Sequence, residues 1–508
     1  MKKLFLLGVG LMTMLFINAQ DYTDALRYSQ ENIQGTARFN ALSGAFGALG
    51  GDISAISINP AGSVIFAQST ANLTLGNQKQ KNMTSYFGSE RFSKISNFDL
   101  LQTGASFVFE NSNLNSPWRK FALSIAYDRT KNFENSWRAE GINRFNTIGQ
   151  YFLEFAQGQR LDEISAFSGE TISEAYAEIG EVFGFGNQQA FLGYESFILD
   201  PEMNTDDNTN YINNITGGDY DQRFDYNATG YNGKLAFNFA TQFEDRLHLG
   251  LNLNSHFINY ERFTLLNEFN NNIGTSIINV NFENYLRATG SGFSFQLGSI
   301  FKLTNELRAG LAYDSPTWFS ISEEGSQYVD ATRNDNGSTI TEVIDPNIIN
   351  IYPEYRLQTP GKITGSLAYV FGPQGLISFD YSRKDYGSIK FRPTSDDYYM
   401  FQNELIENIF DTAATYRFGA EYRHKQLSFR GGYRFEESPY KDDSFYGNLT
   451  GYSLGLGVNF GNMTVDVSYS SSQRDVGYQL YSNSFEFTSA TTIDETQNNF
   501  LLTLGFSI

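Results

Sequence analysis

The sequence predicts an all-β fold: a closed, antiparallel transmembrane β-barrel of about 14 strands, with a small N-terminal hatch that plugs its lumen. Three observations predict it. Apolar and polar residues alternate with a period of two through most of the chain after Ser69. Short and long connections between the predicted strands also alternate, as they do in outer-membrane barrels. A segment rich in glycine and alanine, Gly35 to Gly62, precedes the first strand.

The first 19 residues predict a secretory signal peptide. Lys2 and Lys3 precede an apolar run, residues 4–17, and the small-residue pattern at residues 17–19 is typical of a cleavage site, so we expect the mature protein to begin at Gln20. The apolar run is too short to cross a membrane as a helix. The chain contains no cysteine, which excludes a lipoprotein anchor and disulfide bonds.

The composition restricts the partners of the protein. The formal net charge is −20, from 36 Lys and Arg against 56 Asp and Glu, and such a surface repels nucleic acid. Aromatic residues make up 16% of the chain, whereas only ten of its 508 residues are proline. The mean hydropathy of −0.36 argues against helices in lipid but agrees with a barrel that has a polar lumen and polar loops.

Residues 20–68 predict the hatch. In this segment Phe39, Leu42, Phe46 and Leu49 recur at spacings of three and four, which favours short helical turns. Glycine at this density destabilises helices, so the segment needs surrounding walls to hold it. Pro60 fixes its own φ angle and favours an extended conformation for the residue before it, so any helix ends there.

Residues 69–508 predict the barrel. In one strand, for example, Leu249 and Leu251 share one face while His248 and Gly250 share the other. The predicted strands are 69–86, 98–110, 119–131, 231–242, 245–263, 283–303, 306–322, 355–372, 375–391, 412–424, 426–437, 450–461, 463–477 and 498–508.

The connection over residues 132–230 is the largest, and it is predicted to be an external loop that is partly helical. Its residues 147–185 have apolar side chains at helical spacing, with acidic residues on the other side. Such helices could form an apolar landing platform for a ligand, or they could pack together merely to cap the barrel. The sequence leaves both interpretations open.

A soluble β-sandwich or propeller could also produce many short strands, and alternation alone does not identify the face that meets lipid. The predicted export, the alternating loop lengths and the last strand favour the membrane. In that strand Phe500, Leu502, Leu504, Phe506 and Ile508 alternate to the end of the chain, and this pattern is similar to the signal recognised by the outer-membrane assembly machinery.

The sequence predicts no catalytic or metal site. The chain has three histidines, and His248 and His256 lie eight strand residues apart, roughly 26 Å, too far to bind one metal. No G-x-S-x-G motif is present. We therefore expect a protein that is not an enzyme and that binds no cofactor.

Several segments resemble one known family. The run that ends in Asn59-Pro60-Ala61 is similar to the N-terminal hatch of the FadL/TodX family of outer-membrane channels for hydrophobic compounds, where a Gly/Ala-rich stretch closes on this motif before the first strand. The resemblance covers the hatch and about the last 200 residues, and residues 132–230 do not align. The later segments similar to family strands are 307–316, 357–360, 365–371, 378–381, 416–422, 429–433, 438–439, 455–457 and 466–469.

The resemblance implies passive uptake of long-chain fatty acids or similar hydrophobic compounds across the outer membrane of a Gram-negative cell. In the family, loops catch the ligand, which moves to a pocket between hatch and wall and leaves sideways through a gap in the wall, in contact with membrane lipid. It implies a gate at that gap, formed by Asn59, Pro60 and Ala61. It also implies that the pocket includes Phe39, Leu42, Phe46 and Leu49.

Three alternatives stay open at this point. The four apolar hatch residues could simply pack against one another. The ligand could be another amphiphile, such as haem or a porphyrin. The barrel could instead be a structural or adhesive surface protein that transports nothing. A barrel of 14 strands that is plugged by its own hatch is not a general porin, because eight strands are filled by side chains whereas sixteen or more leave an aqueous channel.

Overall fold

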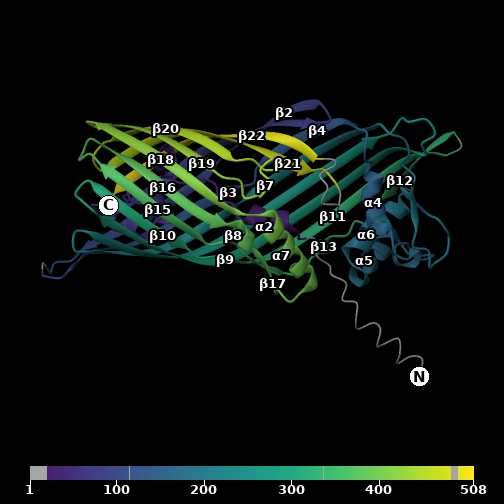
Figure 1. Cartoon of the computed structure of the whole chain (residues 1–508), viewed down its shortest axis with the longest axis horizontal. Coiled ribbons are helices and arrows are strands. Elements are labelled where there is room, and N and C mark those ends of the chain that lie inside the picture. Colours follow the sequence, from purple (N-terminus) through teal and green to yellow (C-terminus); the bar gives the residue numbers. More distant parts are fainter. Residues whose placement is uncertain (1–19, 114, 336, 482–489) are drawn as a thin grey trace, which may run out of the picture.

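An antiparallel sheet closes on itself to form a barrel of 14 strands in this computed structural model (Figure 1). The structure describes residues 20–508 except 114, 336 and 482–489, so the predicted signal peptide lies outside the described residues. Closure is made by the first and last strands, β1 (Thr70–Tyr86) and β22 (Ala490–Ser507), which pair from Thr70–Ser507 to Ser85–Thr492. The closing role of the last strand follows from this pairing.

The wall is described in chain order. Three of its crossings are each made of two consecutive strands: β3 with β4, β10 with β11, and β14 with β15. Between β1 and β22, the strands of the wall have the following bounds: β2 (Ser89–Glu110), β3 (Trp118–Asn132), β4 (Asn135–Asn143), β7 (Tyr220–Phe243), β8 (Leu247–Phe269), β9 (Ile277–Lys302), β10 (Leu307–Asp314), β11 (Trp318–Asp335), β14 (Tyr355–Gln358), β15 (Lys362–Val370), β16 (Gly375–Asp385), β18 (Thr412–His424), β19 (Leu427–Glu436), β20 (Leu449–Asn459) and β21 (Met463–Gln479).

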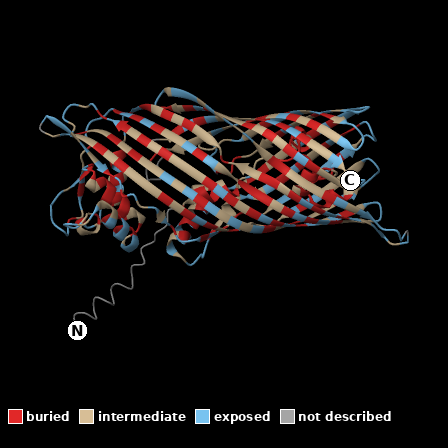
Figure 2. Cartoon of the chain, turned by 180° about the vertical axis from the view of Figure 1, so that it is seen from behind, coloured by how far each residue is buried: buried red, intermediate tan, exposed pale blue. Residues whose placement is uncertain are grey.

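The alternation along each strand sorts side chains between the two surfaces of the wall (Figure 2). Leu249, Leu251 and Leu253 on β8 are exposed on the outside, whereas Asn252 and Asn254 are buried inside. Apolar residues therefore face outward and polar residues face the lumen, the arrangement of a membrane barrel. This assignment identifies the lipid-facing surface, which the period of two could not do.

Several strands extend farther than the sequence pattern indicates. The strand predicted from residue 231 begins at residue 220, and the strand predicted to end at residue 322 continues to residue 335. Much of the sequence assigned to long loops, including residues 264–269 and 277–282, is therefore strand. In these outer ends the apolar residues, such as Phe224, Leu266 and Val280, face inward and pack in the core of the lobe, while the outside meets water rather than lipid. The apolar face is therefore the inner one there, the reverse of the lipid-facing band.

The hatch occupies the lumen and consists of four short helices. They are α2 (Tyr22–Ser29), α3 (Ala37–Ala41), and the 3₁₀ helices η1 (Ile53–Ser57) and η2 (Pro60–Ile65). Each begins at a residue whose side chain caps it: Asp21, Thr36, Asp52 and Asn59. From Ala37 to Val64 almost every residue of the hatch is buried, which the surrounding wall makes possible for so glycine-rich a segment.

The connection between β4 and β7 forms a helical lobe at the end of the barrel opposite the C-terminus (Figure 1). This lobe contains α4 (Ile148–Ala156), η3 (Leu161–Glu163), α5 (Ile172–Val182), α6 (Phe185–Glu195) and a small hairpin, β5 (Leu199–Pro201) with β6 (Tyr211–Asn213). Glu268 of the wall holds its first helix by accepting hydrogen bonds from the Thr147 hydroxyl and the Ile148 amide. Burial raises the pKa of the Glu195 carboxyl, which accepts the Ala166 amide.

The other connections contain β12 (Ser338–Ile344), β13 (Asn350–Ile351), η4 (Tyr386–Ser388), β17 (Lys390–Arg392) and α7 (Asp397–Ile409). In Figure 1, β12 lies at the same end as the lobe, whereas α7 and β17 lie nearer the middle of the long axis. Among the described helices, none combines the length and the apolar character needed to cross a bilayer. Because external loops of outer-membrane barrels are long and periplasmic turns are short, this end faces outward from the cell.

Candidate functional site

The Asn59-Pro60-Ala61 motif packs against the inner side of the wall, at strands whose pairing is continuous. Asn59 donates from its side-chain amide to the Gly47 carbonyl (2.7 Å) and to the Ser299 carbonyl of β9 (2.9 Å), and its side-chain oxygen accepts the Ala61 amide. The Pro60 carbonyl accepts the Asn238 side chain of β7 (2.9 Å). The motif therefore joins the hatch to β7 and β9, where the strand pairing is continuous.

Two glycines of the wall make room for this motif. Gly250 of β8 and Gly298 of β9 are opposite each other across the ladder. A Cβ atom at Gly298 would lie 2.0 Å from the Asn59 side-chain oxygen, and one at Gly250 would lie 2.2 Å from the Pro60 carbonyl carbon. The absence of side chains at both positions lets the hatch backbone touch the wall.

We expect Gly298→Val to displace the hatch while the barrel still closes, because the added side chain overlaps Asn59 and leaves β9 hydrogen-bonded. The hatch of the variant should be cleaved by protease faster than that of the wild type. Gly365→Val on β15 is the control, since nothing lies within 4 Å of a Cβ there. Equal protection of the hatch from protease in both variants would contradict the contact between Gly298 and Asn59.

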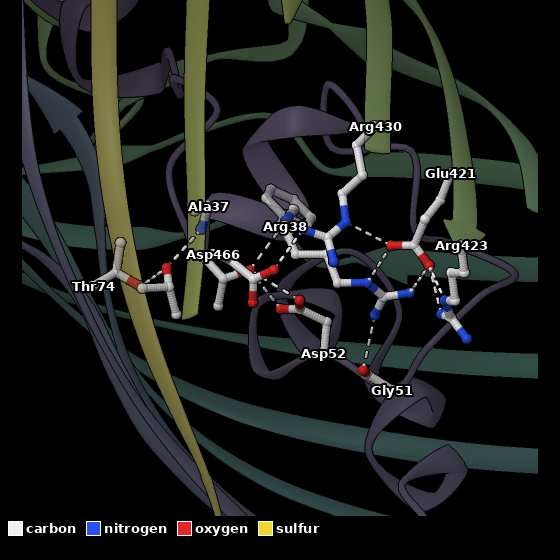
Figure 3. Close-up of polar contacts among 12 residues, drawn as sticks. Ala37, Arg38, Gly51, Asp52, Thr74, Glu421, Arg423, Arg430 and Asp466 are labelled. Atoms are coloured by element: carbon white, nitrogen blue, oxygen red, sulfur yellow. Dashed lines mark hydrogen bonds and ion pairs between the residues drawn. The ribbon is translucent and has the colours of Figure 1, made fainter. Parts of the chain in front are cut away.

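An ion cluster fastens the hatch at the opposite side of the lumen (Figure 3). Arg38 of α3 pairs with Glu421 of β18 at 2.9 Å, and Nη1 of Arg38 donates to the Gly51 carbonyl. Glu421, whose side chain is fully buried, also accepts Arg423 and Arg430, and Arg430 in turn pairs with Asp466. Breaking one partner of such a buried network leaves an uncompensated charge, so this cluster fixes the position of the hatch.

The four hatch residues predicted to line a pocket form a packed cluster. Phe39, Leu42, Phe46 and Leu49 are at most 3% exposed, and the rings of Phe39 and Phe46 lie 5.4 Å apart. The cluster also includes Ala368 of β15. None of the four lines the large cavity of the lumen. Their role in binding stays a prediction, and it requires this cluster to open.

The wall ladder is interrupted between β2 and the β3–β4 strand. The two strands pair from Glu110–Lys120 up to Gln102–Asp128, and beyond that point β2 pairs only with β1 while β3 and β4 pair only with β7. Arg129 and Asp99 form an ion pair across the interruption at 2.6 Å. The outer half of β2 is thus an unpaired edge, which barrels otherwise avoid.

Beyond the interruption, β4 lies against the inner face of the β1–β2 hairpin. The Asn82 side chain of β1 donates to the Ser136 carbonyl of β4 (3.0 Å), and the Ser93 hydroxyl of β2 donates to the same carbonyl (2.8 Å). Side chains therefore replace the missing backbone ladder. In Figure 1 the end of β2 stands away from the wall above β4.

The hatch reaches this interruption through η1. The Ser57 hydroxyl donates to the carboxylate of Asp128, the last residue of β3 that pairs with β2. Ile53 and Ile56 pack against Ala126 of the same strand. Because Ser57 is only two residues before Asn59, a movement of the predicted gate motif would also move the hatch away from the interruption.

A cavity of about 910 Å³ fills the lumen above the hatch. Fourteen of its lining residues are aromatic, and α2 of the hatch forms part of its floor. Its charge differs from that of the whole chain: eight cations against six carboxylates give +2, whereas the chain carries −20. The cations are Arg27, Lys131, Arg262, Lys362, Lys384, Arg417, Arg434 and Arg474.

Two of these arginines face each other across neighbouring strands. Arg417 of β18 is opposite Arg434 of β19, and on its other side it is opposite Asp380 of β16. The Asp380 carboxylate accepts hydrogen bonds from the Phe46 and Gly47 amides of the hatch. The Nε and Nη1 atoms of Arg417 are buried and have no partner among the described residues.

The neighbouring cations are only partly neutralised. Arg434 pairs with Glu436 at 3.2 Å, and Arg474 donates to the Tyr446 hydroxyl at 2.7 Å and lies 3.9 Å from the same Glu436, so one carboxylate serves both arginines. Like charges placed directly opposite each other destabilise a sheet, and buried charged groups require partners. The arrangement of Arg417, Arg434 and Arg474 therefore suits an anionic group inside the cavity.

Two of the three histidines, His248 and His256, form hydrogen bonds. A ring nitrogen of His248 lies 3.2 Å from the Ile300 carbonyl, and one of His256 lies 2.8 Å from the Ser294 hydroxyl. In the part of the chain that the structure describes, no three His, Asp or Glu residues gather in a way that could hold a metal ion.

Comparison with known proteins identifies the family. A family profile described as "Outer membrane protein transport protein (OMPP1/FadL/TodX)" matches residues 197–507, more than half of the chain. The chain belongs to the FadL/TodX family. Its relatives are transport channels of the outer membrane for hydrophobic compounds, and the closed barrel places this member in the same membrane. No curated protein sequence matches the chain.

Solved structures share the fold of this FadL/TodX family member. A FadL homologue from Pseudomonas aeruginosa is 11% identical, with a TM-score of 0.56, and the alignment covers 94% of this chain and 99% of that one. The toluene transporter TodX from Pseudomonas putida is 12% identical, with a TM-score of 0.50, and the alignment covers 94% and 99%. At these identities the likeness concerns the fold alone.

The sequence analysis missed the cavity cations, although a signal for two of them is present. Arg417 lies between Tyr416 and Phe418, and Arg434 lies between Tyr433 and Phe435. In a strand whose aromatic residues face lipid, a residue between two of them must face the lumen. The alternation therefore predicts both arginines inside, but not that the two strands place them side by side.

Proposed function

We propose that this FadL/TodX family member is a passive channel for anionic amphiphiles, with long-chain fatty acids as the most fitting class. The observation that carries the proposal is the cavity, which joins an aromatic lining to an excess of cations, among them Arg417, whose buried Nε and Nη1 atoms have no hydrogen-bond partner among the described residues. Its volume of about 910 Å³ lies within the range of roughly 300–1,000 Å³ that is typical of small-molecule sites. An aromatic wall suits an alkyl chain, and arginines suit a carboxylate.

Uptake begins, in this proposal, at an outer mouth between the helical lobe and α7. Phe155 and Phe185 of the lobe line the cavity on one side, and Tyr398 and Phe401 of α7 line it on another. The Phe401 side chain is about half exposed, so it is accessible to a ligand outside. This arrangement favours the landing-platform interpretation of the lobe, because two of its aromatic residues line the cavity.

The exit is proposed at the interruption between β2 and the β3–β4 strand. Ile95, in the part of β2 that pairs with β1 but not with β3, lines the cavity, and so does Asn135 at the start of β4. The interruption lies beside Tyr127, a lipid-facing residue whose ring stacks on that of Phe257. A greasy molecule that leaves there enters the membrane directly and avoids crossing the hatch.

The predicted gate, Asn59, Pro60 and Ala61, keeps its role in this proposal through η1. The motif is anchored to β7 and β9, and η1 connects that anchor to Ser57 at the interruption. A shift of the anchor would therefore uncover the exit. The proposal assigns the pocket itself to the cavity lining, with the cluster of Phe39, Leu42, Phe46 and Leu49 as the packed support below it.

The test removes the two opposed arginines. Each hydrogen bond to a charged group contributes about 1.5–3 kcal/mol, so Arg417→Gln with Arg434→Gln should lower the affinity for a fatty acid roughly tenfold or more. Uptake of oleate into proteoliposomes measures this. Uptake of the matching fatty alcohol should change little, because it has no carboxylate. Arg383→Gln, at an outward-facing exposed position of β16, is the matched control.

Each other outcome names an alternative. Equal losses for acid and alcohol would point to a damaged barrel, and preferred uptake of toluene would point to neutral hydrocarbons. A porphyrin also carries carboxylates, so uptake of a porphyrin but not of oleate would show that the same cations bind a porphyrin instead of a fatty acid. No uptake of any probe by the wild-type protein would favour a structural or adhesive barrel.

A further inference from the structure

Three lysines form a basic patch on the outer surface of the β1–β2 hairpin. Lys79 and Lys81 lie on β1, and Lys94 lies on β2 directly opposite Lys81. They share the outward face with Phe98 and Met83, both of which are exposed, whereas Gln78 and Gln80 on the opposite face line the cavity. We call these three residues the lysine patch.

The patch lies just outside the lipid-facing band. A row of lipid-facing positions runs across four strands, through Phe98, Asn77, Phe500 and Tyr469, and the exposed pair Met83–Phe92 lies on the same face beyond the patch. Lys79 follows Asn77 by two residues and Lys81 by four, which on a tilted strand corresponds to about 5 and 10 Å above that row. The headgroup layer of a bilayer adds about 5–8 Å on each side of the hydrocarbon core, so it includes the height of Lys79, and the long side chain of Lys81 can reach down to it.

The three ammonium groups have no partner of opposite charge. None forms an ion pair or hydrogen bond with another described residue. Lys81 and Lys94 are instead a like-charge pair on adjacent strands, which destabilises the hairpin unless an anion lies between them. Arg287, which also points outward from the wall, is by contrast flanked by Glu261 and Glu324.

The nearest acidic residues do not relieve this repulsion. Asp494 of β22 and Asp475 of β21 are opposite each other, one row farther from the membrane than Lys81. They are exposed and form no ion pair with the lysine patch. A protein with a net charge of −20 thus has three lysines without an ion pair close together on one outward face, beside lipid-facing aromatic residues.

We infer that the lysine patch binds the phosphorylated headgroup of a lipid in the outer leaflet. The phosphates would lie between Lys81 and Lys94 and beside Lys79, while the acyl chains would run down past Phe98 and Phe500. Clusters of lysine next to a membrane surface attract anionic lipids in this way. The site is independent of the proposed transport function, although it lies on the same hairpin as the unpaired edge of β2.

The experiment uses the full-length barrel in detergent with bisphosphorylated lipid A as the probe, titrated by native mass spectrometry without divalent cations. Replacing Lys79, Lys81 and Lys94 by Gln should lower the affinity at least tenfold at low salt, and high salt should weaken binding to the wild type. The triple Arg variant keeps the charge and should bind as the wild type does. Lys425→Gln, at a turn on the other end of the barrel, is the control.

Three results would overturn the inference. They are an unchanged affinity in the triple Gln variant, equal binding of dephosphorylated lipid A, and displacement of the lipid by inorganic phosphate at a similar concentration. The last would show a site for a free anion rather than a lipid. If the Gln variant fails to fold, the salt dependence of the wild type and the Arg variant decide the question.

Discussion

Removal of residues 21–58 should convert the protein from a closed barrel into an open pore for small polar solutes. The hatch contacts the wall on all sides: Ala37 bonds to Thr503, Ser43 to Ser453, and Asn59 to Ser299. Fourteen strands enclose more space than wall side chains alone can fill. Without this segment, the conductance of the barrel in a planar bilayer should rise by at least about tenfold, toward that of an aqueous channel.

A shorter deletion is the control for this experiment. Removal of residues 21–33 takes away α2, which lines the cavity, but keeps the packed segment that follows. Its conductance should stay close to that of the wild type, because α3, η1 and η2 still fill the lumen below the cavity. If both deletions conduct equally, or if neither does, the segment from Gln34 to Ile58 is not the plug.

The sequence predicted the part of the barrel that touches lipid better than the part outside it. In the lipid-facing band each strand must alternate apolar and polar residues, as Leu249 and Asn252 do, and that constraint is visible in the sequence. Above the band the outside of the wall is wet, so the alternation at residues 220–230 is reversed, with apolar residues such as Phe224 facing inward. The same residues are strands because their neighbours extend them, which is a tertiary effect.

The candidate site could be predicted only in part. The Asn59-Pro60-Ala61 motif was recognisable by resemblance, but its seat depends on Gly250 and Gly298, about 190 and 240 residues away in the chain. The apolar spacing of Phe39, Leu42, Phe46 and Leu49 is equally compatible with a pocket and with a packed cluster, since both require the same residue types. The position of the exit depends on where one ladder ends, which no local pattern encodes.

The cavity illustrates why charge placement needs the fold. Arg417 and Arg434 are 17 residues apart in the sequence, and the register of β18 and β19 makes them direct neighbours. Asp380 is opposite Arg417, but its carboxylate accepts hydrogen bonds from the hatch amides. The buried nitrogens of Arg417 that lack a hydrogen-bond partner among the described residues therefore result from three segments together: two strands of the wall and the hatch.

A disulfide across the interruption of the wall should stop transport. The chain contains no cysteine, so a new pair is the only one that can form. The Ser93 hydroxyl lies 2.8 Å from the backbone carbonyl of Ser136, so β2 and β4 are adjacent at this level, and we choose Ser93→Cys with Ser136→Cys as the pair to join them. If lateral release through this interruption limits transport, oxidation should reduce fatty-acid uptake about tenfold, and a reductant should restore it.

The matched control joins the same two crossings where they are already paired. Ser106 of β2 and Ser124 of β3 are opposite each other, and their hydroxyls lie 2.8 Å apart. Oxidation of Ser106→Cys with Ser124→Cys should leave uptake unchanged, because the ladder is closed at that level. If uptake persists with the 93–136 disulfide formed, the ligand instead leaves through the hatch. In that case Gly298→Val should accelerate uptake, because that substitution displaces the hatch without changing β2.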